Sequence, residues 1–144
     1  MAPDSPRLTV VLSGTSSDSH TWNLVFLQLL LAEQGCHVVN LGPCAPDPLI
    51  VSECERVRPD LVVLSSVNGH GHVDGARAVR LLRRTPGLAT VPVVIGGKLD
   101  LGRPENRAGA GLADAGFTAV FGDGDEDVRR FCGFVASLPA RTCA

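Results

Sequence analysis

The sequence has no run of basic residues and no stripe in which basic and aromatic residues alternate. Such features follow the phosphate backbone in nucleic-acid-binding proteins. The 13 basic and 15 acidic residues nearly balance, and the formal net charge is -2. These absences argue against nucleic acid as a partner.

Long hydrophobic runs are also missing. The longest, Leu24 to Ala32, is interrupted by Gln28, and it is far shorter than the roughly 20 apolar residues that cross a bilayer. The N-terminal stretch MAPDSPR lacks the apolar core of a signal peptide. The sequence therefore predicts a soluble cytoplasmic protein with no membrane association.

Several chemical motifs are absent as well. No CxxC occurs, and the cysteines form an odd set at wide spacings, which argues against a disulfide framework or a zinc ribbon and predicts reduced thiols. There is no G-x-S-x-G nucleophile motif, and neither glycine-rich phosphate loop follows the first predicted strand. The five cysteines are Cys36, Cys44, Cys54, Cys132 and Cys143.

What the sequence does contain is a repeated alternation of strand and helix signals. Short, valine-rich, continuously apolar segments are typical of strands buried on both faces of a parallel sheet. They occupy residues 7–14, 36–42, 60–67, 91–97 and 117–122. Stretches of helical length lie between and after them: Thr21–Gln34, Asp47–Arg58, Asp74–Arg84, Ala108–Ala115 and Asp125–Leu138.

This order predicts an α/β fold, a single flavodoxin-like (Rossmann-like) doubly wound domain with a five-stranded parallel sheet. We expect one domain over residues 1–144, with a core at about 7–138 and short flexible termini. Ligands of such sheets bind beyond the carboxyl ends of the strands. The loops expected there are richer in glycine and polar residues than the turns at the opposite edge, which indicates a ligand site.

The first of these loops contains SDSHTWN, in which Asp18 and His20 are two residues apart. The carboxylate can accept a hydrogen bond from one imidazole nitrogen and leave the other facing a metal or a proton. The alternative is that Asp18 or Ser19 caps the following helix and His20 is an exposed loop residue. A zinc site built by the protein alone would need three or four ligands. The only other loop histidines, His70 and His72, could line a cleft or face solvent, so the pattern favours one histidine offered to a metal inside a macrocyclic cofactor.

The spacing of three elements resembles the cobalamin-binding domains of adenosylcobalamin mutases and methionine-synthase-type methyltransferases. The pattern of that family is D-x-H-x-x-G, then S-x-L, then G-G. Here the three elements stand at residues 18–23, 65–67 and 96–97, in the family's order and at its spacing.

Within that family, the chain resembles the small (sigma) subunit of glutamate mutase, also called methylaspartate mutase, over almost its whole length. The resemblance includes GCHVVNLG, VLSSVNGHGHVDG and VVIGGKLDLG. The chain starts at the first predicted strand without the helical cap domain of the methyltransferases, which favours the mutase branch. The resemblance implies a cobalamin-binding subunit of an adenosylcobalamin-dependent carbon-skeleton mutase, an isomerase that is inactive without a large barrel-type subunit carrying the substrate pocket. The alternatives are a corrinoid-binding module without mutase activity, either a methyl carrier or a cobalamin sensor, and a domain that binds no corrinoid.

The resemblance also implies roles for individual residues. His20 replaces the cofactor's own dimethylbenzimidazole as the lower axial ligand of cobalt, and Asp18 bonds the far nitrogen of His20. No other residue of this chain is expected to be catalytic. The displaced nucleotide tail lies in a slot lined by Ser65, Val67, Gly96, Gly97, Phe121 and Gly122, where glycine lets a bulky ligand approach the backbone. The full expected cofactor-binding set is Ser17, Asp18, Ser19, His20, Thr21, Asn23, Ser65, Val67, Asn68, Gly69, Gly96, Gly97, Phe121 and Gly122.

Three positions depart from the family pattern. Asn23 stands in place of glycine, Val67 in place of leucine, and Asn68 in place of an aromatic residue. Asn23 either narrows the tail slot or contributes a new hydrogen bond. The sequence leaves three interpretations of Trp22: it lines the cofactor site, it lies in the core, or it contacts a partner. Loop residues on the same rim can meet the corrin amides, a partner or solvent: His70, His72 and Lys98.

Overall fold

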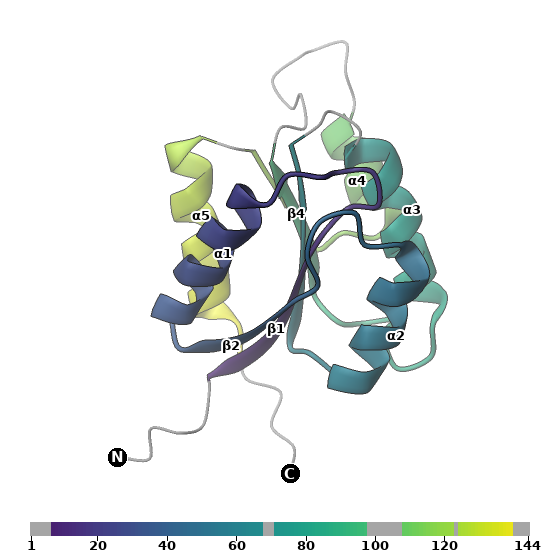
Figure 1. Cartoon of the computed structure of the whole chain (residues 1–144), viewed down its shortest axis with the longest axis horizontal. Helices are drawn as coiled ribbons and strands as arrows, with labels where there is room; N and C mark the ends of the chain where they lie inside the picture. The colour runs from purple at the N-terminus through teal and green to yellow at the C-terminus, as the bar shows by residue number, and fades with distance from the viewer. Residues whose placement is uncertain (1–6, 68–70, 98–107, 123, 140–144) are drawn as a thin grey trace.

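The computed structural model describes residues 7–67, 71–97, 108–122 and 124–139, and it shows a five-stranded sheet between two layers of helices (Figure 1). The strand order is β2-β1-β3-β4-β5, and every neighbouring pair is parallel. This confirms the predicted flavodoxin-like α/β fold. The strands are β1 (Leu8–Gly14), β2 (Cys36–Asn40), β3 (Leu61–Ser66), β4 (Val93–Gly97) and β5 (Ala119–Phe121). The helices are α1 (Trp22–Glu33), α2 (Asp47–Val57), α3 (Gly71–Arg84), α4 (Ala108–Ala115) and α5 (Asp125–Ser137).

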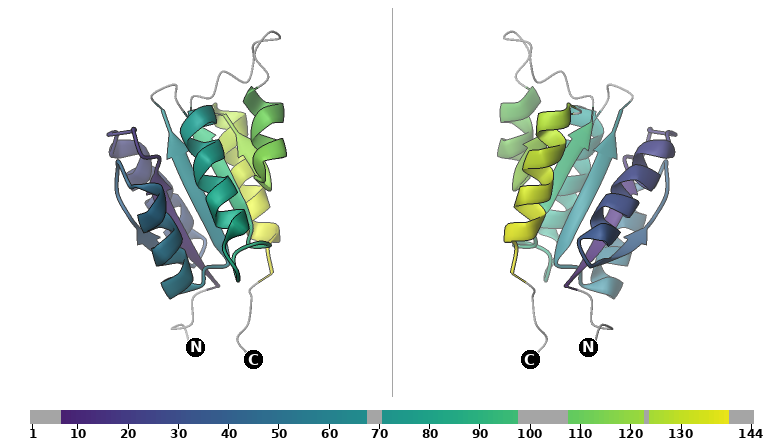
Figure 2. Two further views of the ribbon diagram at one scale, coloured as in Figure 1. Left: turned by 90° about the vertical axis from the view of Figure 1, so that its right-hand side faces the viewer. Right: turned by 90° about the vertical axis from the view of Figure 1, so that its left-hand side faces the viewer.

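The sheet has a hydrophobic core on each face, because successive side chains of a strand point to opposite sides. In β1, Val10 and Leu12 pack into one core and Val11 into the other. Helices α1 and α5 cover the first face, and α2, α3 and α4 cover the second (Figure 2). Both faces are therefore buried, which explains why the strands are continuously apolar in the sequence.

Most element boundaries differ from the predicted ones by one or two residues, and the largest difference is at the start of α3. Helix α3 begins at Gly71 rather than Asp74, because the glycine-rich sequence before Asp74 carries no recognisable helix start. Strand β5 spans only Ala119–Phe121, so the ends of the predicted segment 117–122 do not pair with β4. The ends of α1 and α2 are set by left-handed backbone, at Gly35 (φ 85°) and Arg58 (φ 53°).

The topology brings the expected site residues to one edge of the sheet. Strand β1 pairs with β2 on one side and β3 on the other, so the connections after β1 and β3 diverge at the carboxyl edge. This divergence is where doubly wound sheets bind ligands. At the opposite edge, the guanidinium of Arg7 donates to the backbone carbonyls of Val135 and Leu138, at 2.6 and 3.1 Å.

Among the described helices, none has the length and apolar character needed to cross a membrane.

Candidate functional site

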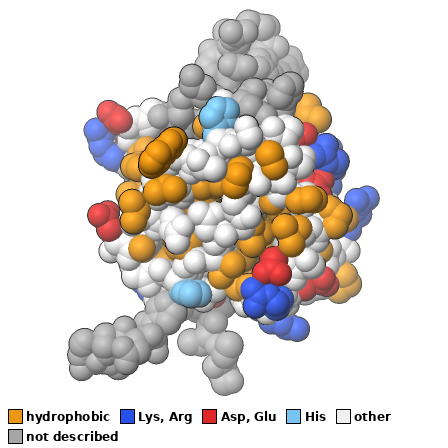
Figure 3. Space-filling view, viewed as in Figure 1, with side chains coloured by type: hydrophobic (Ala, Val, Ile, Leu, Met, Phe, Trp, Pro, Cys, Tyr) orange, Lys and Arg blue, Asp and Glu red, His pale blue; other side chains and the backbone are white. Residues whose placement is uncertain are grey.

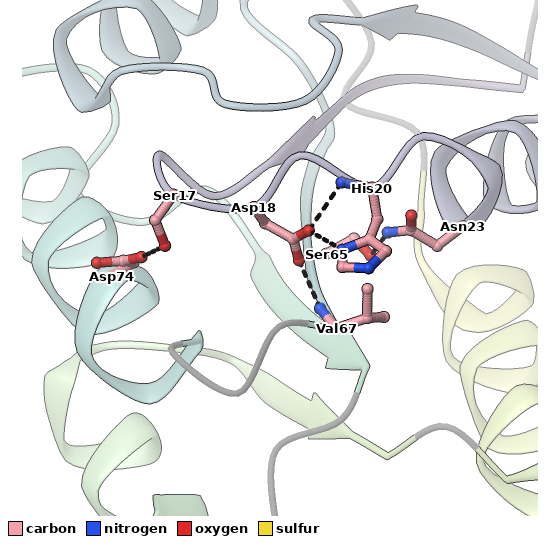
Figure 4. Close-up of polar contacts among 7 residues, drawn as sticks. All are labelled: Ser17, Asp18, His20, Asn23, Ser65, Val67 and Asp74. Atoms are coloured by element: carbon pink, nitrogen blue, oxygen red, sulfur yellow. Dashed lines mark hydrogen bonds and ion pairs between the residues drawn. The ribbon is translucent and has the colours of Figure 1, made fainter.

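Asp18 lies at the centre of a hydrogen-bond network at the carboxyl edge (Figure 4). The residue is 1% exposed. Its Oδ1 atom accepts from His20 Nδ1 at 2.6 Å and from the backbone N–H of His20 at 3.0 Å. Its Oδ2 atom accepts from the backbone N–H of Val67 at 2.5 Å. The carboxylate thus joins the loop after β1 to the end of β3.

These contacts keep Asp18 ionised. Burial raises the pKa of the carboxyl, but the backbone hydrogen bonds from His20 and Val67, together with the His20 ring, outweigh it and hold the pKa below its ordinary value. The expected alternative, in which Asp18 or Ser19 caps α1, is wrong. The N-cap of α1 is Thr21, and no side chain caps the helix there.

His20 presents one ring nitrogen outward. Because an ionised carboxylate only accepts hydrogen bonds, Nδ1 carries the proton that is shared with Asp18. In the neutral imidazole, Nε2 then has a free lone pair, and within the described part of the chain nothing hydrogen-bonds it. The His20 side chain is 56% exposed. In the described residues no three His, Cys, Asp or Glu side chains gather around a common point, so His20 offers a metal one protein ligand.

A cavity of about 160 Å³ opens beside this pair, between the sheet and helices α1 and α5. Its walls are mainly apolar, and it extends from the start of α1 across β3 and β4 to β5 and α5. The lining residues are Asn23, Phe26, Leu27, Leu30, Val63, Ser65, Val67, Val94, Gly96, Gly97, Phe121, Gly122, Asp127, Val128 and Phe131. The structure therefore brings Asn23 and all six residues of the expected tail slot to one cavity.

Residues 8–131 match the family model for the B12 binding domain. The chain belongs to the B12-binding domain family. It is 27% identical over 97 residues to the glutamate mutase sigma subunit of Clostridium cochlearium, an alignment that covers 67% of this chain and 70% of that one.

One further curated protein is similar in sequence, and one solved structure is similar in fold. The HTH-type transcriptional repressor CarA of Myxococcus xanthus is 34% identical over 96 residues, which are 67% of this chain and 32% of the repressor. The chain thus spans about a third of that relative's length. A cobalamin-binding protein of Desulfitobacterium hafniense has the same fold, with a TM-score of 0.68 at 23% identity, covering 89% of this chain and 58% of that one.

The residues of this B12-binding domain fit a corrinoid. His20 supplies one outward nitrogen ligand, and the cavity beside it is apolar with few polar groups, as small-molecule sites are. Asn23 Nδ2 donates to Ser65 Oγ across the cavity, and Asn23 Oδ1 is buried with no partner among the described residues. An unpartnered buried acceptor of this kind suits a ligand that brings a donor.

The adjacent glycines Gly96 and Gly97 differ in whether the fold could accept a side chain there. Gly97 has φ 126°, and a Cβ there would lie 1.9 Å from the carbonyl oxygen of Ser66, so the fold itself requires this glycine. A Cβ at Gly96 would meet only Phe121, at 3.6 and 3.7 Å, which is ordinary contact. Of these two glycines, only Gly96 has room for a side chain, and that side chain would take up space in the cavity.

Hydrogen bonds with α3 hold the loop that carries Asp18 and His20, and the sequence pattern did not predict them. Ser17 Oγ donates to Asp74 Oδ2 (Figure 4). Arg77 donates to Asp47 at 2.6 Å and to Ser16 at 2.7 Å. Asp47 and Asp74 each lie in the first turn of their helices, α2 and α3, which is the one signal that could have suggested them.

The remaining expected residues lie at the rim or outside the description. Ser17, Ser19 and Thr21 are exposed on the loop that carries His20. Trp22 is 82% exposed, which excludes the core position that the sequence left open. Four residues lie outside the described part of the chain, as does the side chain of His72: Asn68, Gly69, His70 and Lys98.

Proposed function

We infer that this B12-binding domain is the cofactor subunit of an adenosylcobalamin-dependent carbon-skeleton mutase resembling glutamate mutase, an isomerase of the cytoplasm. The observation that carries this proposal is the buried, ionised Asp18 that orients His20 beside a mainly apolar cavity. The similarity to a glutamate mutase sigma subunit supports it.

In the proposed complex, cobalamin is bound base-off and His-on. His20 Nε2 would hold the cobalt, and Asp18 would fix the ring orientation and the tautomer. The cavity between the sheet and α1 would receive the nucleotide tail, with Asn23, Ser65 and Asp127 as its polar side chains and Gly96 leaving space beside Phe121. The rim residues Ser17, Ser19 and Thr21, and the neighbouring Asn68 and Gly69, complete the proposed binding set. Adenosylcobalamin supplies radical chemistry when bound.

A separate large barrel-type subunit is proposed to bind the substrate. The cavity near His20 is mainly apolar, and its described lining gives an amino-acid substrate no paired charged groups. The test combines the purified chain with a glutamate mutase large subunit, adenosylcobalamin and glutamate, with methylaspartate formation followed by NMR. Product that requires both proteins and is lost in His20→Ala supports the proposal. A chain that binds cobalamin but supports no turnover with any mutase large subunit, on glutamate or on other acids, contradicts it.

A second candidate is a cobalamin-responsive module without mutase activity. The observation in its favour is the 34% identity to a protein named as a transcriptional repressor. This reading predicts that cobalamin changes which protein the chain associates with, and that no large subunit confers isomerase activity. Sedimentation with and without cobalamin, alongside the NMR assay, separates the two functions.

A further inference from the structure

Among the described residues that line the cavity, Asn23 is the one whose side chain has a buried polar atom with no hydrogen-bond partner. It is the second residue of α1, and its amide reaches across to Ser65 at the carboxyl end of β3 (Figure 4). This contact spans two walls of the cavity beside His20. The amide therefore lies in the wall of the cavity, between α1 and β3.

The oxygen of this amide lacks a hydrogen-bond partner among the described residues. Asn23 Nδ2 is satisfied by Ser65, but Oδ1 is buried and accepts nothing in the described part of the chain. Leaving a buried acceptor unpaired is unfavourable, because the group has lost its water without gaining a partner. The other buried side-chain atoms without a described partner do not line the cavity: Thr15 Oγ1, Gln34 Nε2 and Asp47 Oδ1.

The other polar side chains of the described lining, Ser65 and Asp127, already take part in hydrogen bonds. Asp127 also lines the cavity, but its Oδ1 already accepts from Arg130 at 2.7 Å, and its Oδ2 accepts from the backbone N–H of Gly124 at 3.4 Å. The neighbouring walls are apolar at Phe26 and Phe121. Asn23 Oδ1 is thus the buried side-chain acceptor of the described lining that accepts no hydrogen bond, whereas Ser65 Oγ and the Asp127 carboxylate each accept at least one.

We propose that Asn23 makes corrinoid binding depend on the nucleotide tail, by accepting a hydrogen bond from a ribose hydroxyl of that tail. This inference rests on the proposed function, because it takes the cavity to be the tail slot. The dimethylbenzimidazole base carries no N–H, whereas the ribose carries hydroxyl donors, so the sugar is the part of the tail that matches an acceptor. A glycine at this position has no side chain to make such a bond.

The test compares cobalamin with cobinamide, a corrinoid that lacks the nucleotide tail, in binding titrations followed by absorption. Asn23→Leu removes the acceptor at similar size, and Asn23→Gly removes it while adding space. Gln28→Leu is the matched control, because Gln28 is an amide on the same helix that bonds Asn40 outside the cavity. Thermal unfolding of each variant shows that it is folded.

We expect both Asn23 variants to lose about tenfold in affinity for cobalamin, within the range measured for buried hydrogen bonds, while affinity for cobinamide stays within about twofold. Gln28→Leu changes neither. Equal losses for both corrinoids, or an unchanged preference for cobalamin in both Asn23 variants, overturns the inference and leaves the proposed function standing. A wild-type chain that binds neither corrinoid overturns both.

Discussion

At the scale of single residues, Asp18 is the buried, hydrogen-bonded carboxylate on which the geometry of the site depends. It is almost completely buried and accepts hydrogen bonds from His20 and from the Val67 backbone. The D-x-H spacing predicted the contact with His20. The contact with Val67 could not be predicted, since it joins residues 49 positions apart that only the pairing of β1 with β3 brings together.

Asp18→Asn should lower the free energy of unfolding by about 1–3 kcal/mol at pH 7, because an amide cannot accept all of the hydrogen bonds at once. The folded-state pKa of Asp18 lies below the unfolded value of 3.8, so its contribution is complete above that value and is lost as the pH falls through the folded pKa. Urea unfolding from pH 7 to about pH 3 should show the gap between wild type and variant closing on acidification. A gap that is constant over this range contradicts the assignment.

The cysteines should differ sharply in reactivity. Burial raises the pKa of Cys54 to about 12, and burial also raises the pKa of Cys36, whereas Cys44 is exposed. Only the thiolate reacts with alkylating reagents. Iodoacetamide at pH 8 should therefore modify Cys44 in the folded protein and leave Cys54 intact until the chain is unfolded. Peptide mapping by mass spectrometry measures this, and rapid native labelling of Cys54 would show that the core around it opens.

At the scale of elements, the strands were the most predictable feature. A parallel strand covered on both faces must be apolar throughout, and this leaves a continuous signal in sequence. The start of α3 and the support of the D-x-H loop were not predictable. Asp47, Asp74 and Arg77 come from two helices, and their contacts with Ser16 and Ser17 depend on how α2 and α3 pack beside β1.

Strand β4 ends in two glycines that should respond differently to the same substitution. Gly97→Ala should lower the free energy of unfolding by more than about 3 kcal/mol, because its Cβ would overlap the Ser66 carbonyl at a positive φ. Gly96→Ala should change it by less than about 1 kcal/mol and still weaken cobalamin binding, because the added methyl group occupies the cavity. Denaturant unfolding and cobalamin titration measure the two effects. A stable Gly97→Ala, or a Gly96→Ala with wild-type affinity, is inconsistent with these roles.

Helix α1 buries few of its apolar side chains. Leu24 and Leu31 face the core, but Trp22, Phe26 and Leu29 are 82%, 50% and 62% exposed. Periodicity could not reveal this arrangement, since a helix that is apolar all round gives no preferred face. The sequence therefore located the helix but did not orient it.

At the scale of the whole molecule, the side formed by α1 and β2 has little charge. Residues 19–46 contain a single charged residue, Glu33, apart from histidines. Figure 3 shows hydrophobic side chains across this face and charged side chains mainly along its margins. A surface of this composition next to His20 fits the proposed partner, which would cover the rim where His20 lies.

Trp22→Ser tests that arrangement. Trp22 lies two residues from His20, whereas Leu29 is about two turns farther along α1. If Trp22 lies in the interface with the proposed large subunit, Trp22→Ser should weaken association with that subunit by about 2 kcal/mol or more, without lowering thermal stability. Leu29→Ser is the matched control and should change association less. Association measured by calorimetry that is equal for wild type and Trp22→Ser would place the partner elsewhere.

The most direct test of the account is the EPR spectrum of Co(II) cobalamin bound to the protein labelled with nitrogen-15 at histidine. Axial coordination by His20 predicts nitrogen splitting that changes from a triplet to a doublet on labelling and disappears in His20→Ala, which should still fold because the side chain is 56% exposed. Splitting that is unaffected by the label, or that persists in His20→Ala, would contradict base-off, His-on binding.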